Sequence, residues 1–329
     1  MATGDTSEGD WGREGSRLVS RPLTPGDVEE VARLASRWPG GEAFDAAFVH
    51  ALDTWSGAQV DHLPGTLAVE NPAGGFLALG SVTVSADVLH ERRADVRFVL
   101  HPDVAGGSLA FVFLDALERQ ALERLGVSRA AGADADVPSV VRFTLIEDEA
   151  VARHLESRGF AFAHAEDDMA CGRPEVEAAF DGELLPWRED TASDFFRAYE
   201  AAFGTRPGFP AWSERVWRAF ATEYDEFAPT LSRVAVRDGR PLGFLITALA
   251  PDDATTGAHI VQVGVAPEAR RRGVARALIA DLARRVPADV PVFTLSVNAD
   301  NPSAAALFAS LGYATRQRRS VYRKVVSAS

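Results

Sequence analysis

Residues 263–278 read VGVAPEARRRGVARAL, a short apolar run followed by an arginine-rich turn and the start of a helix. The apolar run ends at Pro267, and Val274 to Arg285 have the residue spacing of an amphipathic helix. A helix that starts directly after a strand leaves several backbone N–H groups without partners. Those donors and the positive end of the helix dipole favour phosphate binding. Because Gly273 leaves room for a ligand at the backbone, the stretch predicts a site for a polyanionic cofactor.

The pattern in this stretch differs from two common phosphate-binding motifs. Neither a GxxxxGK[ST] loop nor a GxGxxG turn opens the helix near Gly273. The pattern that is present, Arg270-x-x-Gly273-x-Ala275, resembles the cofactor signature of the GNAT superfamily, the acyl-CoA-dependent N-acyltransferases. Residues 295–313 read LSVNADNPSAAALFASLGY and resemble the next motif of that family, in the same order along the chain.

The resemblance implies that the turn binds an acyl-CoA, most simply acetyl-CoA, and that no metal ion takes part. Backbone N–H groups after Arg270 would surround the pyrophosphate, while the main chain at Val263 and Val265 would pair with the pantetheine arm. An N–H near Val265 would polarise the thioester carbonyl. The expected cofactor-binding residues are Val263, Val265, Arg270, Arg271, Arg272, Gly273, Val274, Ala275, Arg276, Asn301 and Phe308.

The catalytic groups are less clearly marked than the cofactor turn. An ammonium substrate needs a base with a pKa near the working pH, and His259 starts the strand that leads to the turn. The resemblance implies that His259 is this base, whereas the alternative is a solvated histidine at a strand end. Phe308 stands where many family members carry a tyrosine that protonates the departing CoA thiolate. Phenylalanine has no proton to give, so another hydroxyl or water would have to do so.

Acidic residues elsewhere in the second half are alternatives to His259 as the base, or candidates for holding a cationic amine. Glu223, Asp225 and Glu226 are the expected substrate residues, and Asp252 and Asp253 are alternatives. Each of these carboxylates also fits an ordinary solvated surface. Residues 265–329 contain eleven Lys and Arg and four Asp and Glu, a net charge of +7. Because the net charge of the whole chain is −13, residues 1–264 together carry −20. That acidic part disfavours nucleic acid and would attract a cationic partner.

Composition indicates a cytoplasmic globular chain. At 329 residues the chain suits two domains of roughly 150 residues each. No apolar run reaches the roughly 18 residues of a membrane span. The single cysteine, Cys171, excludes an internal disulfide and is typical of a reduced compartment. Residues 1–16 are polar and acidic, so we expect a disordered tail there rather than a signal peptide.

The two halves of the chain have similar landmarks. In the second half we expect a hairpin around Asp238-Gly239, strands at 259–265 and 292–297, and a last strand at 321–326. In the first half Pro102 corresponds to Pro267, but Ala105 and Ser108 stand where Arg270 and Gly273 would be.

The sequence therefore predicts two tandem GNAT-like domains of mixed α/β fold. Each would have a mostly antiparallel sheet flanked by helices, and the first copy would have a degenerate cofactor turn. We expect the first domain at 17–172, a linker at 173–183 and the acyl-CoA-binding domain at 184–329.

The function implied by the resemblance is transfer of an acetyl group from acetyl-CoA to the primary amine of a small, cationic molecule. The amine would attack directly while both substrates are bound. Two alternatives stay open: a CoA-binding regulatory protein without catalysis, and an aminoacyl transferase of the Fem type. The Fem type needs a basic surface for tRNA, which the acidic first 264 residues do not provide. A homodimer also stays open.

Overall fold

The computed structural model describes residues 20–35, 63, 65–85, 91–126, 138–146, 148–206, 209, 212–222, 226–249 and 257–326. The tail predicted at 1–16 and the residues Glu223, Asp225, Asp252 and Asp253 lie outside these ranges. The chain forms two compact units, one made of residues 1–165 and 319–329, the other of residues 166–318. None of the helices in the described ranges is long and apolar enough to cross a membrane.

The first unit is a sheet with the strand order β1-β2-β3-β4-β5-β12. Neighbouring strands are antiparallel except for β4 and β5, which run parallel. The elements are β1 (Ser20–Arg21), α1 (Val28–Ala35), β2 (Thr66–Glu70), β3 (Phe76–Ser85), β4 (Arg92–Leu100), α3 (Ser108–Arg124), β5 (Ser139–Ile146) and α4 (Glu149–Ser157), joined by the end of β12 (Ala314–Val326).

The second unit is a sheet with the strand order β7-β8-β9-β10-β11-β6. The parallel pair here is β10 and β11. The elements are the end of β6 (Ala161–Cys171), β7 (Glu183–Pro186), α5 (Ala192–Phe203), α6 (Glu214–Ala221), β8 (Arg233–Arg237), β9 (Arg240–Leu249), β10 (Ala258–Val265), α7 (Val274–Arg285), β11 (Phe293–Asn298), α8 (Pro302–Ala309) and the start of β12.

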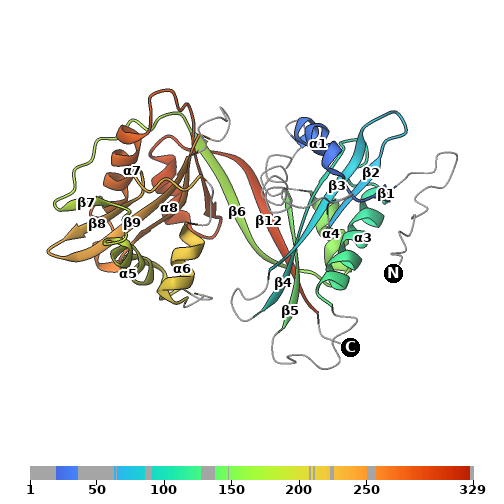
Figure 1. Cartoon of the computed structure of the whole chain (residues 1–329), viewed down its shortest axis with the longest axis horizontal. Coiled ribbons are helices and arrows are strands. Elements are labelled where there is room, and N and C mark those ends of the chain that lie inside the picture. Colours follow the sequence, from blue (N-terminus) through green and yellow to red (C-terminus); the bar gives the residue numbers. More distant parts are fainter. Residues whose placement is uncertain are drawn as a thin grey trace. The chain divides into compact units, whose positions relative to one another are not determined.

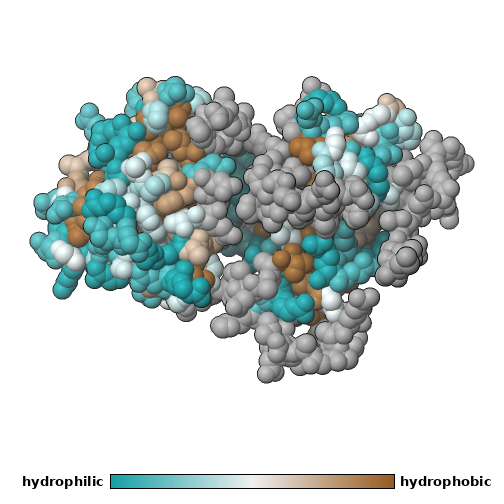
Figure 2. Space-filling model, viewed as in Figure 1, coloured by the Kyte–Doolittle hydropathy of each residue, from teal (hydrophilic) through white to brown (hydrophobic). Residues whose placement is uncertain are grey.

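Helices cover both faces of the second sheet (Figure 1). Phe244 of β9 belongs to the aromatic cluster under α5 and α6, which contains Tyr199 and Trp217. The next residue, Leu245, packs in the other cluster, with Leu278 of α7. Because successive residues of a strand point to opposite faces, α5 and α7 lie on opposite sides of the sheet. Hydrophilic residues make up most of the visible surface of this unit (Figure 2).

Each unit contains one strand from the other half of the sequence. Glu166–Cys171 of β6 pair with β11 from Asn298 to Phe293, inside the second unit. Arg319–Val326 of β12 pair with β5 from Ile146 to Ser139, inside the first unit. The last strand is therefore longer than the predicted 321–326, and its end belongs to the first unit.

Local signals in the second half agree with the structure. The predicted helix 274–285 is α7, and the hairpin is formed by β8 and β9. Asp238 (φ 52°) and Gly239 (φ 71°) at its turn both have positive φ, as a type I′ turn requires. In the first half the helix that follows Pro102 is α3.

Candidate active site

The turn between β10 and α7 has the geometry of an anion site. After the single 3-10 turn Pro267–Ala269, the backbone adopts positive φ at Arg271 (61°) and at Gly273 (80°). Gly273 is the N-cap of α7, and no side chain in the described residues caps that helix. The first helical bond runs from the Ala277 N–H to the Gly273 carbonyl, so the N–H groups of Val274 to Arg276 have no acceptor within the helix.

Space is also available at this turn. No atom in the described part of the chain lies within 4 Å of a Cβ placed on Gly273. Donors in open space at the positive end of a 12-residue helix match the phosphates of a polyanionic cofactor. The residues present therefore fit the cofactor turn predicted from the sequence.

The arginines of the turn have different surroundings. The Arg270 guanidinium donates from Nε to the Val265 carbonyl (3.1 Å) and from Nη2 to the Ala202 carbonyl (3.0 Å), so it connects the turn to α5. Arg276 donates to the Ser310 hydroxyl (2.7 Å). The side chains of Arg271 and Arg272 are exposed.

The parallel strands β10 and β11 separate beyond the third aligned pair. Their register runs from Ala258↔Phe293 to Ile260↔Leu295. On the other edge of β10, the pairing with β9 shifts between Ile260 and Gln262, which leaves Val261 as a bulge. A bulge bends its strand and increases the local twist. The rest of β10 and β11 therefore run on without pairing to each other and leave a wedge between them.

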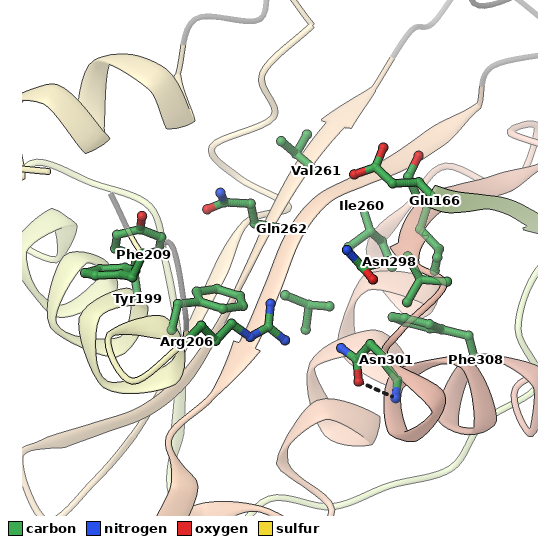
Figure 3. Close-up of a pocket in the computed structure, with 16 residues that line it drawn as sticks. Glu166, Tyr199, Arg206, Phe209, Ile260, Val261, Gln262, Asn298, Asn301 and Phe308 are labelled. Carbon is green, nitrogen blue, oxygen red and sulfur yellow. Dashed lines mark hydrogen bonds between the residues drawn. The ribbon is translucent and has the colours of Figure 1, made fainter. Parts of the chain in front are cut away.

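A groove of about 430 Å³ occupies this wedge (Figure 3). Five elements supply its walls, all within the second unit. The lining residues are Ile260, Val261, Gln262 and Val263 of β10; Leu295, Ser296, Val297 and Asn298 of β11; Tyr199 and Phe203 of α5 with Arg206 and Phe209 after it; Asn301, Ala304 and Phe308 at α8; and Glu166 of β6.

The groove contains some of the predicted site residues. Val263 lines it directly, and Asn301 lines it while its Oδ1 accepts the Ala304 N–H (3.2 Å) as the cap of α8. Phe308 also lines it and is 4% exposed, with its ring edge-to-face on Tyr313. Val265 ends β10, and its carbonyl accepts from Arg270.

His259 does not line this groove. It lies at the paired end of β10, opposite Thr294, and its Nδ1 is 2.9 Å from the Thr294 hydroxyl oxygen. Glu226 is exposed beside the bridge between Phe227 and Ala248, and it does not line the groove either.

The sequence reasoning missed six polar residues of the groove, among them Ser296 and Asn298 of β11. Tyr199 and Arg206 come from α5 and the turn after it, Gln262 accepts from the Trp217 Nε1 (3.3 Å), and Glu166 comes from β6. The cluster Glu166-Asp167-Asp168 was a visible acidic run, but it lies before the range assigned to the acyl-CoA domain. Only its pairing with β11 brings it to the groove.

Tyr313 and Tyr322 do not replace the missing acid at Phe308. Tyr313 is 3% exposed, and burial together with Cys171 holds the pKa of its hydroxyl well above the usual range. Tyr322 packs in the hydrophobic core of the first unit.

The first unit repeats this layout with different strand pairing. Its parallel strands β4 and β5 stay aligned over six pairs, from Arg92↔Ser139 to Arg97↔Thr144. The register of β3 and β4 runs without a shift from Ala78↔Leu100 to Ser85↔Arg93. Among the described strands of the first unit, β4 and β5 therefore leave no wedge like the one between β10 and β11 beside Val261.

Comparison with known proteins identifies the family. The model of the Acetyltransferase (GNAT) family matches residues 187–313, which include the turn, α7, and the wedge between β10 and β11. Residues 187–313 are a domain of the GNAT acetyltransferase family. A GCN5-related N-acetyltransferase from Sphaerobacter thermophilus has the same fold, with a TM-score of 0.70 at 21% identity over 94% of this chain and 96% of that one.

A tandem GNAT protein from the clavulanic acid biosynthesis pathway shares the fold over the whole length. Its TM-score is 0.57 at 16% identity, with 94% of this chain and 98% of that chain covered. The predicted tandem arrangement is thereby confirmed.

Two curated acetyltransferases are similar in sequence to this GNAT protein. The mycothiol acetyltransferase of Nocardioides sp. (strain ATCC BAA-499 / JS614) is 28% identical over 305 residues, which is 87% of this chain and 92% of that protein. The L-2,4-diaminobutyric acid acetyltransferase of Nocardia farcinica (strain IFM 10152) is 39% identical over 84 residues, 25% of this chain and 43% of that protein. The protein is an acyl-CoA-dependent N-acyltransferase.

Proposed function

We propose that this GNAT protein transfers the acetyl group of acetyl-CoA to the primary amine of a small molecule. The observation that carries the proposal is the groove between β10 and β11, which lies in the same unit as the open donor turn at Gly273. Acetyl-CoA supplies an activated thioester. The amine nitrogen attacks its carbonyl carbon, the C–S bond breaks, and the ammonium proton passes to a base of the protein.

Cofactor binding falls to the backbone. The free N–H groups at the start of α7 would hold the pyrophosphate, and the unpaired edge of β10 at Val263 and Val265 would bind the pantetheine arm. Asn301 and Phe308 line the same groove and would contact the cofactor from α8. The side chain of Arg270 would act by holding the turn in shape, because its guanidinium donates to the backbone carbonyls of Val265 and Ala202.

A direct attack of the amine, without an acyl-enzyme, agrees with the state of the sole cysteine. Cys171 does not line the groove, and burial raises the pKa of its thiol to about 11. A thiol is a poor nucleophile when so little of it is ionised. We therefore place both substrates in the groove at the same time.

Glu166 is the base that the geometry favours. It is the carboxylate that lines the groove, and it is only partly exposed (Figure 3). A carboxylate there would hold the ammonium form of the acceptor and accept its proton. His259 stays the alternative, acting through water from the paired end of β10. The thiolate would take its proton from water, since Phe308 has none to give.

Charge agrees with a small amine as the partner rather than nucleic acid or membrane. Residues 1–264, which contain β6, α5 and most of β10, carry the net charge of −20. Net negative charge attracts cations and disfavours nucleic acid.

The test combines binding with product detection. Titration calorimetry should show one acetyl-CoA site, and an amine panel should give free thiol and acetylated product by mass spectrometry. Thiol release without an acetylated amine would mean hydrolysis alone and would refute the proposal, as would the failure of acetyl-CoA to bind.

A further inference from the structure

Arg206 places a positive charge on the wall of the groove opposite Glu166. It follows α5 directly, and its guanidinium lies over the ring of Phe203, with the Cζ atom 4.7 Å from the ring centroid. Figure 3 shows its guanidinium group reaching toward the space between the α5 side and β10. The stacked ring holds the side chain in one place without neutralising it.

The charge of Arg206 is unmatched in the described part of the chain. No carboxylate there pairs with its guanidinium, and the nearby charged group is another cation, Arg270. Burial, and then Arg270, lower the pKa of the Arg206 side chain. The two arginines differ, since Arg270 donates to two backbone carbonyls, whereas among the described residues no carbonyl accepts from the guanidinium of Arg206. A partly desolvated arginine beside a second cation is stabilised when an anion arrives.

The other side of the groove has the opposite charge. Glu166 lies on β6, aligned with Asn298 of β11, and its carboxylate faces the groove. Tyr199 and Phe209 add an aromatic surface on the Arg206 side of the groove (Figure 3). A groove with a carboxylate at one side and a guanidinium at the other complements a molecule that carries both an amine and an anionic group.

We propose that Arg206 binds a carboxylate of the acceptor, so that the acceptor is an amino-acid-like molecule whose amine is held at Glu166. This inference rests on the proposed amine acetylation and adds the class of amine. A guanidinium suits a carboxylate because two parallel N–H donors match its two oxygens. The same donors could instead serve an anionic group of the cofactor, so the experiment has to separate the two sources of negative charge.

The experiment uses the full chain and matched pairs of acceptors. Each amine in the panel is offered as the free carboxylate and as its carboxamide, and kcat/KM is measured with saturating acetyl-CoA. The wild type should prefer the carboxylate by about 10- to 100-fold, the usual effect of one charge-assisted hydrogen-bonding group. Arg206→Gln should abolish that preference, Arg206→Lys should restore part of it, and the acetyl-CoA affinity of both variants should stay within about threefold of wild type.

Arg197→Gln is the matched control. Arg197 lies on α5, the helix before Arg206, pairs with Asp194 and does not line the groove, so its loss should leave the preference unchanged. If Arg206→Gln weakens acetyl-CoA binding and the carboxylate preference persists, Arg206 serves the cofactor and the inference is wrong. Acetylation of amines with equal rates for carboxylate and carboxamide would overturn the inference while leaving the proposed function intact. If no amine of either kind is acetylated, the proposed function itself fails.

Discussion

Ile260 and Leu295 are the last aligned residues of the parallel strands β10 and β11. One residue further on β10, Val261 bulges out of the register with β9. The bulge turns the rest of β10 away from its neighbour, and the wedge that results is lined from both strands. The position of the groove thus depends on a single inserted residue in one strand.

Substitution of Gly273 should affect cofactor binding more than stability. Gly273→Glu would place a carboxylate among the donors at the start of α7, and we expect acetyl-CoA to bind at least about 100-fold more weakly because of charge repulsion. Gly273→Ala meets no neighbouring atom and should cost about 1 kcal/mol, the strain of a positive φ. Calorimetry measures both affinities.

Gly239 offers a matched control for that experiment. It also has a positive φ (71°) and no atom of the described residues within 4 Å of a Cβ, but it lies in the hairpin turn between β8 and β9. Gly239→Glu should leave acetyl-CoA affinity unchanged. Equal losses in the two variants would show that backbone strain, and not the cofactor turn, causes the effect.

Glu166→Gln and His259→Ala should separate the two candidate bases. Glu166→Gln keeps the shape of the side chain but removes the base, so we expect kcat to fall by about 10²-fold or more and the acidic limb of the pH–rate profile to disappear. His259→Ala should lower kcat by less than about tenfold, because His259 does not line the groove.

Asp168→Asn is the control for Glu166→Gln. Asp168 lies two residues further along β6, where it accepts from Ser296 and Gln317 rather than lining the groove. We expect the pH–rate profile of the Asp168→Asn variant to match that of the wild type. If instead the acidic limb of the pH–rate profile disappears in His259→Ala and persists in Glu166→Gln, His259 is the base.

Asp27 should make the stability of the chain depend on pH. Hydrogen bonding to Arg21 and to Thr24 lowers the pKa of this carboxyl from 3.8 to about 2. A carboxyl with a lowered pKa stabilises the folded state above pH 3.8, and this stabilisation is lost as the pH falls toward 2.

We therefore expect Asp27→Asn to lower the free energy of unfolding by about 1–2 kcal/mol at pH 7, with a difference that shrinks between pH 4 and pH 2.5. Urea unfolding at several pH values measures this difference. Glu149→Gln removes an exposed ion pair with Arg153. Its free energy of unfolding should stay within about 0.5 kcal/mol of the wild type at each pH. A difference for Asp27→Asn that stays constant down to pH 2.5 would contradict the assigned role of its charge.

Lys324 should stabilise the first unit although it lies near the C-terminus. Its Nζ donates to Glu118 (2.8 Å) and to the Arg158 carbonyl (2.8 Å), and Glu118 is buried on α3. We expect Lys324→Ala to lower the free energy of unfolding by about 2 kcal/mol, because one hydrogen bond to a buried charge is lost. Hydrogen exchange should quicken in α3 rather than in α7.

The neighbouring Arg323 provides the comparison. It pairs with Glu91 at 3.3 Å and is largely exposed, so Arg323→Ala should change stability by no more than about 0.5 kcal/mol. Faster exchange confined to α7 in Lys324→Ala would contradict the assignment of the last strand to the first unit.

The sequence was informative where the signal is local. The turn at Gly273, helix 274–285 and the cap at Asn301 were predictable because capping and periodicity act within a few residues. The groove was predictable only in part. Its bulge at Val261 has no sequence signature, since a bulge shows as a shift in the pairing of two strands.

Residues brought in by pairing over long distances could not be predicted in the same way. Glu166 reaches the groove through alignment with Asn298, 132 positions further along the chain, and no local pattern encodes that register. Arg206 follows a helix without any periodic feature of its own. His259 was chosen for its place before the turn, but the alternation of the strand determines where its side chain points.

In each unit one edge strand of the sheet, β12 in the first and β6 in the second, comes from the other half of the sequence. A fragment that starts at residue 184 would lack the partner of β11 and with it Glu166, while it would still carry the strand that pairs with β5. A truncated first half would leave the edge of β5 exposed and prone to association. Deleting residues 17–172 would thus remove Glu166 and part of the groove wall, which gives a physical reason for the first copy to persist.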